Sequence, residues 1–341
     1  MGGQTATADD STAGPSSDDY VLPFQLDSSG ARGRLVRLGP VVDTILNQHA
    51  YPEQVLRLLG EAVTLTAMLG AALKIDGKFI LQTQSDGPVS FLVVHYNTPG
   101  HVRGYASFNE EEVARAGNGA GESFKPLLGQ GHLAMTIDPG AGMDRYQGIV
   151  TLAGDTLVDA AHEYFDQSEQ IPTFIRIAVA RHFVARSNGK QAQWTWRAGG
   201  LMVQKLPQAG GNPREHQPLP DERDARDDEG WVRAQTLAAT VEDHELLDPT
   251  LAPERLLYRL FHEEDVRAYN ATTLDARCNC SREKVEQMLA RFSEEDIRDM
   301  ADGDVISVTC EFCNRNYRFN VADYENRQRA ENQPGGADDA D

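Results

Sequence analysis

The chain has four cysteines, and all of them lie in its last fifth. They form two close pairs, Cys278-x-Cys280 and Cys310-x-x-Cys313, on either side of the stretch 281–309. Thiolates are preferred ligands of Zn²⁺, and two of them on one short turn bind the same ion with little extra loss of chain entropy. The spacing therefore predicts a tetrahedral site for one Zn²⁺ per chain, with all four cysteines as metal ligands.

The stretch between the two pairs has to bring them together. Ser281 is a candidate helix N-cap, because apolar residues follow it at helical spacing. Ser293 predicts the start of a second short helix, and Asp302-Gly303 predicts a turn into a strand from Val305 to Thr309. A helix and hairpin unit of about 60 residues has too small a core to be stable alone, so we expect the metal to supply folding free energy.

The residues alone leave two interpretations of the four thiols open. The first is a permanent structural zinc site, because closed all-cysteine sites are mostly structural. The second is a redox switch. A disulfide across one intervening residue, as in Cys278-x-Cys280, closes a strained ring of the labile kind, and zinc keeps the sulfurs as thiolates, the form that oxidants attack. Loss of the ion would then unfold the unit.

The chain is strongly acidic: its 341 residues include 52 Asp and Glu against 32 Lys and Arg, a formal net charge of -20. Tight binding to a phosphate backbone depends on Lys and Arg, so we expect no nucleic-acid partner. No apolar stretch approaches the roughly 20 residues of a membrane helix, and we expect no membrane association. Paired thiols without a secretion signal at the start of the chain indicate a cytoplasmic protein.

The length of the chain predicts two or three domains. The expected fold class is α+β: an antiparallel-sheet core domain with packed helices, a helical linker, and a small C-terminal zinc-binding domain with four cysteines. The predicted segments are a disordered acidic tail (1–18), the N-terminal α+β core (19–207), a charged loop with a metastable helical linker (208–268), the zinc-binding domain (269–324) and a second disordered acidic tail (325–341).

In the core, Pro52 begins a long amphipathic pattern that continues to Leu73 and predicts the central helix. Alternating apolar residues at 79–108 and 133–152 predict antiparallel strands, with a surface excursion at 109–123 between them. A further helix after Gly154 and a closing pair of strands complete the expected elements, at residues 157–165, 174–180 and 194–206.

Motifs for catalysis are missing from the sequence. Its glycine pairs lack the strand and helix context of a nucleotide-binding loop. Its histidines are scattered, and Asp86 and Asp155 beside glycines suit turns and caps. We therefore predict no catalytic residue, no cofactor-binding residue apart from the metal ligands, and no enzyme.

The linker region begins with a polar, charge-dense run at 208–230 that we expect to be solvated. Apolar residues then predict a helix at 231–247 and a second one from Pro253 to Phe261. Acidic residues crowd these helices, so their independent stability is doubtful. They form either an ordinary helical hairpin packed on the core or a metastable linker that exposes apolar faces when a neighbour unfolds.

Several segments resemble a known family. Cys278-Asn-Cys-Ser-Arg-Glu283, Cys310-Glu-Phe-Cys313 and Tyr317-Arg-Phe319 are similar to the C-terminal zinc domain of the bacterial redox-regulated holdase chaperones, the 33-kDa heat-shock protein family. The resemblance covers roughly Asp19 to Asp323. The similar upstream segments are Leu73-Lys-Ile-Asp-Gly77, Ser85-Asp-Gly-Pro88, Arg145-Tyr-Gln-Gly148, Gly154-Asp-Thr-Leu157, Glu163-Tyr-Phe165, Ser168-Glu-Gln170 and Leu260-Phe-His-Glu-Glu264.

This resemblance implies an ATP-independent chaperone that is inactive while its four cysteines bind Zn²⁺. In such proteins, peroxide with heat or hypochlorous acid forms disulfides, which here would be Cys278 with Cys280 and Cys310 with Cys313. Zinc then leaves, the zinc domain and the linker unfold, and the chain tends to form a homodimer. The apolar surface that becomes exposed holds unfolding client proteins.

Three parts of the chain depart from the family pattern: the acidic N-terminal tail, the excursion at 109–123 and the charged run at 210–228. They affect how readily the linker unfolds and leave the metal site untouched. Two other classes of function stay open. One is a thiol-disulfide oxidoreductase acting through Cys310-x-x-Cys313, which lacks a thioredoxin-like context. The other is a constitutive zinc-ribbon adaptor, which the net charge disfavours as a nucleic-acid binder.

Overall fold

The computed structural model describes residues 18–74, 76–116, 123–140, 143–185, 192–206 and 220–322, with the side chains of 220–228 left out. The predicted acidic tails, apart from Asp18, and the first part of the predicted charged loop lie outside these residues. The chain divides into two compact units. The first runs to Ala276, without Gln48–Ala50, and the second begins at Arg277. The predicted domain boundary at residue 269 stays a prediction.

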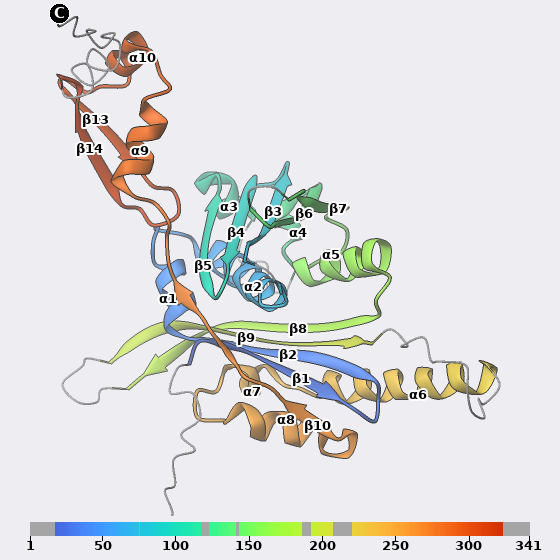
Figure 1. The fold of residues 1–341 in the computed structure, drawn as a ribbon. Coiled ribbons are helices and arrows are strands. Elements are labelled where there is room, and N and C mark those ends of the chain that lie inside the picture. The colour runs from blue at the N-terminus through green and yellow to red at the C-terminus, as the bar shows by residue number, and fades with distance from the viewer. Residues whose placement is uncertain are drawn as a thin grey trace, which may run out of the picture. The chain divides into compact units, whose positions relative to one another are not determined.

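The first unit contains two sheets, each with six strands among the described residues (Figure 1). Sheet A has the strand order β10-β1-β2-β9-β8, and β11 also pairs with β1. Every pairing in it is antiparallel. Its strands are β1 (Tyr20–Leu26), β2 (Ala31–Leu38), β8 (Thr173–Val184), β9 (Gln193–Lys205), β10 (Val266–Ala268) and β11 (Thr272–Thr273).

Sheet B has the strand order β12-β5-β4-β3-β6-β7. Its pairings are antiparallel except for the short parallel pairing of β12 with β5. The predicted alternation is confirmed here, since the five longer strands fall where apolar residues alternate. The strands are β3 (Lys78–Ser85), β4 (Phe91–Asn97), β5 (His101–Ser107), β6 (Gly131–Asp138), β7 (Tyr146–Thr151) and β12 (Asp275–Ala276).

Helix α2 (Glu53–Gly70) lies between the two sheets and contacts strands of both (Figure 1). The predicted start is confirmed, with Pro52 as the N-cap residue. The prediction of an amphipathic helix is wrong, because from Val55 to Gly70 every residue except Arg57 is buried. A helix covered by a sheet on each side has no solvent face, and its polar residues need internal partners. Thr64, for example, donates a hydrogen bond of 2.8 Å to the Gly60 carbonyl.

The first unit also contains several shorter helices and helical turns. The predicted helix after Gly154 is confirmed as α5, where Thr156 forms a capping box with Asp159. The predicted surface excursion contains a helix, α3, with Val113 as its buried residue. The short elements are α1 (Pro40–Leu46), α3 (Glu110–Ala116), α4 (Lys125–Leu128), α5 (Leu157–Tyr164), the π-helical turn η1 (Phe165–Glu169) and the 3-10 turn η2 (His262–Glu264).

Helices α6 (Pro220–Ala239), α7 (Asp243–Leu247) and α8 (Pro253–Phe261) cover one face of sheet A (Figure 1). The predicted loop does not extend to Gly230, because α6 already begins at Pro220. Proline suits the first helical position, and the charges that follow fall at spacings that a helix tolerates. The single helix predicted at 231–247 is two helices, since α6 ends before Thr240 and Glu242 caps α7.

An apolar cluster joins these three helices to sheet A. Phe24 of β1 stacks on Phe261 of α8 with ring centroids 5.5 Å apart. Two buried arginines of the sheet donate to backbone carbonyls of the helical segment: Arg37 to Leu251 (2.5 Å) and Arg197 to Leu247 (2.7 Å). The buried residues of the cluster are Tyr20, Leu22, Phe24, Leu26, Ala31, Leu35, Ala178, Leu201, Val203, Ala234, Ala238, Val241, Leu246, Leu256, Leu257, Leu260 and Phe261.

The second unit contains α9 (Arg282–Leu289), α10 (Glu294–Asp299) and the hairpin of β13 (Val305–Thr309) and β14 (Asn316–Asn320). Both predicted N-caps are confirmed: Ser281 accepts from the Lys284 amide (3.3 Å) and Ser293 from the Asp296 amide (3.1 Å). Its apolar core is small, and its buried members are Leu289, Ile297, Ile306, Tyr317 and Phe319. In the described part of the chain, no helix is long and apolar enough to cross a membrane.

The position of α2 between two sheets leads to a first prediction. Leu58→Ala should lower the free energy of unfolding by about 2–5 kcal/mol, because sheets on both sides limit the collapse of the cavity. Leu58→Met nearly conserves volume and should cost less than about 1.5 kcal/mol. Urea unfolding followed by tryptophan fluorescence measures both. Equal losses for the two variants would contradict the described packing.

Glu264 links helices α6 to α8, which we call the helical cover, to sheet A through hydrogen bonds. Its side chain is only 1% exposed and accepts hydrogen bonds from Ser29, in the β1–β2 turn, and from Arg233 of α6. Burial by itself would raise the pKa of Glu264, but the bonds from Arg233 and Ser29 outweigh it and hold the pKa below its ordinary value of 4.5. The ionised carboxylate therefore stabilises the docked helices.

The stabilisation by Glu264 is complete above pH 4.5 and is lost as the pH falls through the lowered pKa of the folded state. We expect amide hydrogen exchange in α8 to accelerate in that acidic range. Glu264→Gln should exchange faster in α8 already at neutral pH and respond less to acid. Glu263→Gln, a change at an exposed neighbour, is the matched control. Unaltered exchange in Glu264→Gln would show that the Glu264 carboxylate does not stabilise the docked helices.

Candidate metal centre

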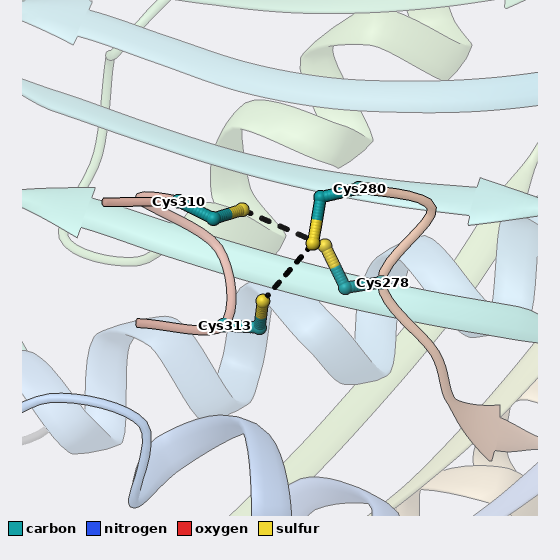
Figure 2. Close-up of side chains that lie close together, drawn as sticks. All are labelled: Cys278, Cys280, Cys310 and Cys313. Atoms are coloured by element: carbon teal, nitrogen blue, oxygen red, sulfur yellow. Dashed lines mark hydrogen bonds between the residues drawn. The ribbon is translucent and has the colours of Figure 1, made fainter. Parts of the chain in front are cut away.

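The four cysteines meet in the second unit although they come from segments far apart in the sequence. Cys278 and Cys280 precede α9, Cys310 follows β13, and Cys313 lies in the turn before β14. Their sulfur atoms all lie within 4.8 Å of one another. Figure 2 shows the four side chains pointing toward a common centre.

The distances between the sulfurs fit a tetrahedral metal site. Sulfur atoms are 3.7 Å apart between Cys278 and Cys310 and 3.4 Å apart between Cys280 and Cys313. Metal–sulfur bonds of about 2.3 Å in a tetrahedron place the sulfurs about 3.8 Å apart. A disulfide would require about 2.05 Å. All four thiols are free, so the structure describes the reduced arrangement.

Local backbone geometry brings the second pair together. The Cys310 amide donates to the Arg315 carbonyl (2.9 Å), and the Asn314 amide donates to the Cys310 carbonyl (2.8 Å). Asn314 has a φ of 53°, a left-handed conformation that asparagine tolerates better than most residues. At the first cysteine pair, the N-cap Ser281 begins α9 directly after Cys280. Turns at both pairs therefore aim the sulfurs inward.

The electrostatics of the cluster call for a cation. Burial raises the pKa of the Cys310 thiol, with a further contribution from Cys278, whereas the backbone N–H groups of Cys313 and Phe312 oppose the rise. Burial and the neighbouring thiols likewise raise the pKa of Cys313 to about 12. Four adjacent thiolates repel one another, and a divalent cation at the centre would remove this repulsion. The donor set therefore fits a soft or borderline metal ion.

Tyr317 connects the cluster to the apolar core, a role that the sequence analysis does not assign. Its hydroxyl donates to the Cys280 sulfur (3.1 Å), and its ring is buried in the core of the second unit. The sequence offers one indication of this contact. Tyr317 lies four residues after Cys313, on a strand that returns past the cysteines. Phe319 lies two residues further along β14, and the guanidinium of Arg282 from α9 lies 4.3 Å from the centre of its ring.

Asp86 and Asp155, the other acidic residues discussed from the sequence, have structural roles. Asp86, predicted to serve a turn, accepts from the Gln130 amide (2.6 Å), and Asp155 accepts from the Ser123 hydroxyl (3.2 Å). Across the described ranges, the four cysteines are the one cluster of His, Cys, Asp or Glu side chains close enough to hold a metal. The structure thus gathers all four predicted ligands, and no His, Asp or Glu of the described residues joins them.

The fold and the cluster define a class of protein: an α+β unit of two sheets around a buried helix, followed by a small unit with four thiols. Comparison with known proteins identifies the class. A family model described as Hsp33 protein matches residues 19–320. The chain therefore belongs to the Hsp33 family.

Relatives in this family carry the name 33 kDa chaperonin. The one from Caulobacter vibrioides (strain NA1000 / CB15N) is 42% identical over 304 residues, which cover 89% of this chain and 95% of the relative. The one from Ectopseudomonas mendocina is 36% identical over 308 residues, which cover 90% and 94%. These relatives support a chaperone function for this chain.

A solved structure confirms the fold. The crystal structure of a 33 kDa chaperonin, a heat shock protein 33 homologue from Thermotoga maritima, matches with a TM-score of 0.69 and 21% sequence identity. The match covers 92% of this chain and 99% of that one. The predicted α+β fold class and the predicted family are both confirmed.

The geometry of the cluster leads to a prediction about metal binding. Cys278→Ser or Cys310→Ser should lower the bound metal from about one ion per chain to nearly none and should unfold the β13–β14 hairpin, because a hydroxyl is a poor ligand for a soft ion. Thr309→Ser, next to Cys310, is the control. Elemental analysis and amide exchange of the full chain measure both effects. Unchanged metal content in both cysteine variants would show that the cluster is no metal site.

Proposed function

We propose that this protein is a redox-regulated, ATP-independent holdase chaperone of the cytoplasm. The observation that carries the proposal is the cluster of four reduced thiols in a unit whose apolar core is small. Such a unit depends on its metal, so its folding responds directly to the oxidation state of the sulfurs. Membership in a family whose relatives are named chaperonins supports the same conclusion. We propose no catalytic activity, no nucleic-acid partner and no membrane association.

The proposed metal is one Zn²⁺ per chain, bound by Cys278, Cys280, Cys310 and Cys313 in the reduced, inactive form. Four thiolates at tetrahedral distances suit Zn²⁺, and a site closed by four protein ligands leaves no open position for catalysis. Bound zinc would supply the positive charge that the four sulfurs require and much of the folding free energy of the second unit.

Oxidation is the proposed trigger. Each disulfide forms when two thiols lose two protons and two electrons, which reduce one molecule of peroxide to two molecules of water. The proposed pairs are Cys278 with Cys280 and Cys310 with Cys313. The sulfur contacts of 3.7 Å and 3.4 Å instead join one pair to the other, Cys278 to Cys310 and Cys280 to Cys313. Once zinc leaves and the unit opens, the partners with the shortest intervening chain stay closest, which favours the proposed pairs.

The proposed consequence is loss of the helical cover from sheet A. Helices α6 to α8 bury an apolar face whose members include Phe24, Leu35, Leu201 and Val203. Release of these helices would expose that face, and an exposed apolar surface binds unfolding client proteins. The same surface would promote a homodimer of the oxidised form. The strongly acidic composition of the chain opposes its own aggregation in that state.

Light scattering by a heat-unfolding client protein tests the function. We expect no suppression by the reduced, zinc-loaded chain, and suppression after peroxide treatment at raised temperature, in step with zinc release. The zinc-loaded chain heated without peroxide is the control, because neither proposed disulfide can form there. Equal suppression by the reduced and the oxidised chain would mean a constitutive chaperone. No suppression in either state would contradict the proposal.

A further inference from the structure

Two arginines on β2, a central strand of sheet A, lack the partners that the other arginines of the sheet have. Arg32 and Arg34 form no side-chain hydrogen bond or ion pair with the described part of the chain, and the Nε of Arg32 is buried without an acceptor. The other arginines contact carbonyl groups, carboxylates or an aromatic ring; they are Arg37, Arg176, Arg181, Arg197 and Arg267. Two cations without a counter-charge therefore lie close together on one strand.

Both side chains stand on the same face of sheet A. Residues two apart on a strand point the same way, with their Cα atoms about 7 Å apart. Val36 and Leu38 continue this face and belong to the apolar core that contains α2. The helical cover lies on the opposite face, where Leu35 packs. Arg32 and Arg34 are half-buried, so they are partly withdrawn from water and still within reach of a ligand from solution.

The surroundings of the pair disfavour its charge. Burial, together with the charge of Arg32, lowers the pKa of Arg34 from 12.5 to about 10, and no carboxylate of the described residues opposes this shift. On the neighbouring strand side, the Asp27 carboxylate is paired with Arg267 (2.6 Å). Both guanidinium groups are charged at neutral pH, so the fold carries the cost of two half-buried like charges. An anion close to both groups would remove that cost.

Uncharged amide side chains flank the pair. In the register of the sheet, Gln25 of β1 and Gln204 of β9 lie directly opposite Arg32. Gln204 is buried and donates one amide N–H to the Thr173 hydroxyl (3.2 Å). A side-chain amide has two N–H groups, so Gln204 has a second donor. The neighbours of Arg32 in the sheet therefore bring donors and no negative charge to this face.

We propose that Arg32 and Arg34 bind a phosphate-type oxyanion on this face of sheet A. A guanidinium group matches the oxygens of a phosphate with two parallel hydrogen bonds, and each such charge-assisted bond is stronger than a neutral one. Two guanidinium groups on neighbouring positions can contact different oxygens of one tetrahedral anion. The site belongs to the first unit. It goes beyond the proposed redox switch and does not depend on it.

Inorganic phosphate is the probe for the natural, full-length, zinc-loaded chain. Titration calorimetry should show one phosphate per chain. Phosphate at roughly ten times its dissociation constant should raise the unfolding temperature of the first unit by about 3 °C or more. Sodium chloride at equal ionic strength is the control for screening. O-phosphoserine distinguishes two sources of the group: an equal response assigns the site to phosphate monoesters as well, and no response restricts it to the free ion.

Arg32→Gln and Arg34→Gln test the two arginines. Each should weaken phosphate binding about tenfold or more, because charge-assisted hydrogen bonds are lost. In phosphate-free buffer, Arg34→Gln should unfold at the temperature of the natural chain or above it, because the substitution removes repulsion between like charges. Arg181→Gln is the matched control. Arg181 lies on the same face of the sheet, with its guanidinium over the Trp196 ring, and its substitution should leave the phosphate response unchanged.

Three results would overturn the inference: no heat of phosphate binding, equal stabilisation by chloride, or unchanged phosphate affinity in both glutamine variants. A marked fall in the phosphate-free unfolding temperature of Arg34→Gln would show that Arg34 has a partner within the chain, and would overturn it as well. If the glutamine variants do not fold, Arg34→Lys keeps the charge without the planar fork and should still weaken binding. Failure of these tests leaves the chaperone proposal intact, because suppression of client aggregation is measured without phosphate.

Discussion

One constraint governs the rest of the structure: four half-buried sulfurs must share a small volume in a unit that has little else to hold it together. The sulfurs lie within 4.8 Å of one another, and the apolar core beside them has five buried side chains. Without a cation, burial and mutual repulsion oppose the thiolates. With one, the same crowding becomes four metal bonds. We therefore propose that the sulfurs set the stability of the unit, and that a change in their oxidation state has structural consequences that a larger core would prevent.

The chain path offers a way for such a change to reach the first unit. Residues between α8 and Cys278 form three short strands: β10 and β11 pair with β1 at the edge of sheet A, and β12 pairs with β5 at the edge of sheet B. These pairings are only two or three residues long and lead directly into the first cysteine pair. Strand pairings this short contribute little stability by themselves. Helices α6 to α8 beside them pack on sheet A through an apolar cluster that includes Phe24 and Phe261, and polar contacts of Arg37 and Glu264 add to it.

Local signals in the sequence predicted the clustering of the four cysteines and the helix caps beside it. The spacing of the cysteines and the caps at Ser281 and Ser293 act within a few residues, and the structure has them as predicted. Features that depend on distant partners were missed. Strands β1 and β2 were not predicted. In β2, Arg34 and Arg37 interrupt the apolar pattern, and Arg37 is buried with bonds to the Leu251 and Glu245 carbonyls, which are distant in the sequence.

Dependence on partners distant in the sequence also explains the other differences between the predictions and the structure. Helix α2 looks amphipathic in the sequence, and only the presence of a second sheet buries its polar residues, among them Thr64. The role of Tyr317 depends on the hairpin that returns it to Cys280. Burial by elements distant in the sequence has no local signature, so the composition of the core was predictable and its two-sheet architecture was not.

The most direct test of the central claim is amide hydrogen exchange of the full chain, reduced with zinc and then oxidised by peroxide at raised temperature. We expect the amides of α8 and β1 to lose protection from exchange together with those of the β13–β14 hairpin. The amides of α2, between the two sheets, should stay protected. If α8 stays as protected as α2 after zinc has left and the hairpin has unfolded, the metal does not control the helical cover, and the proposed switch is wrong.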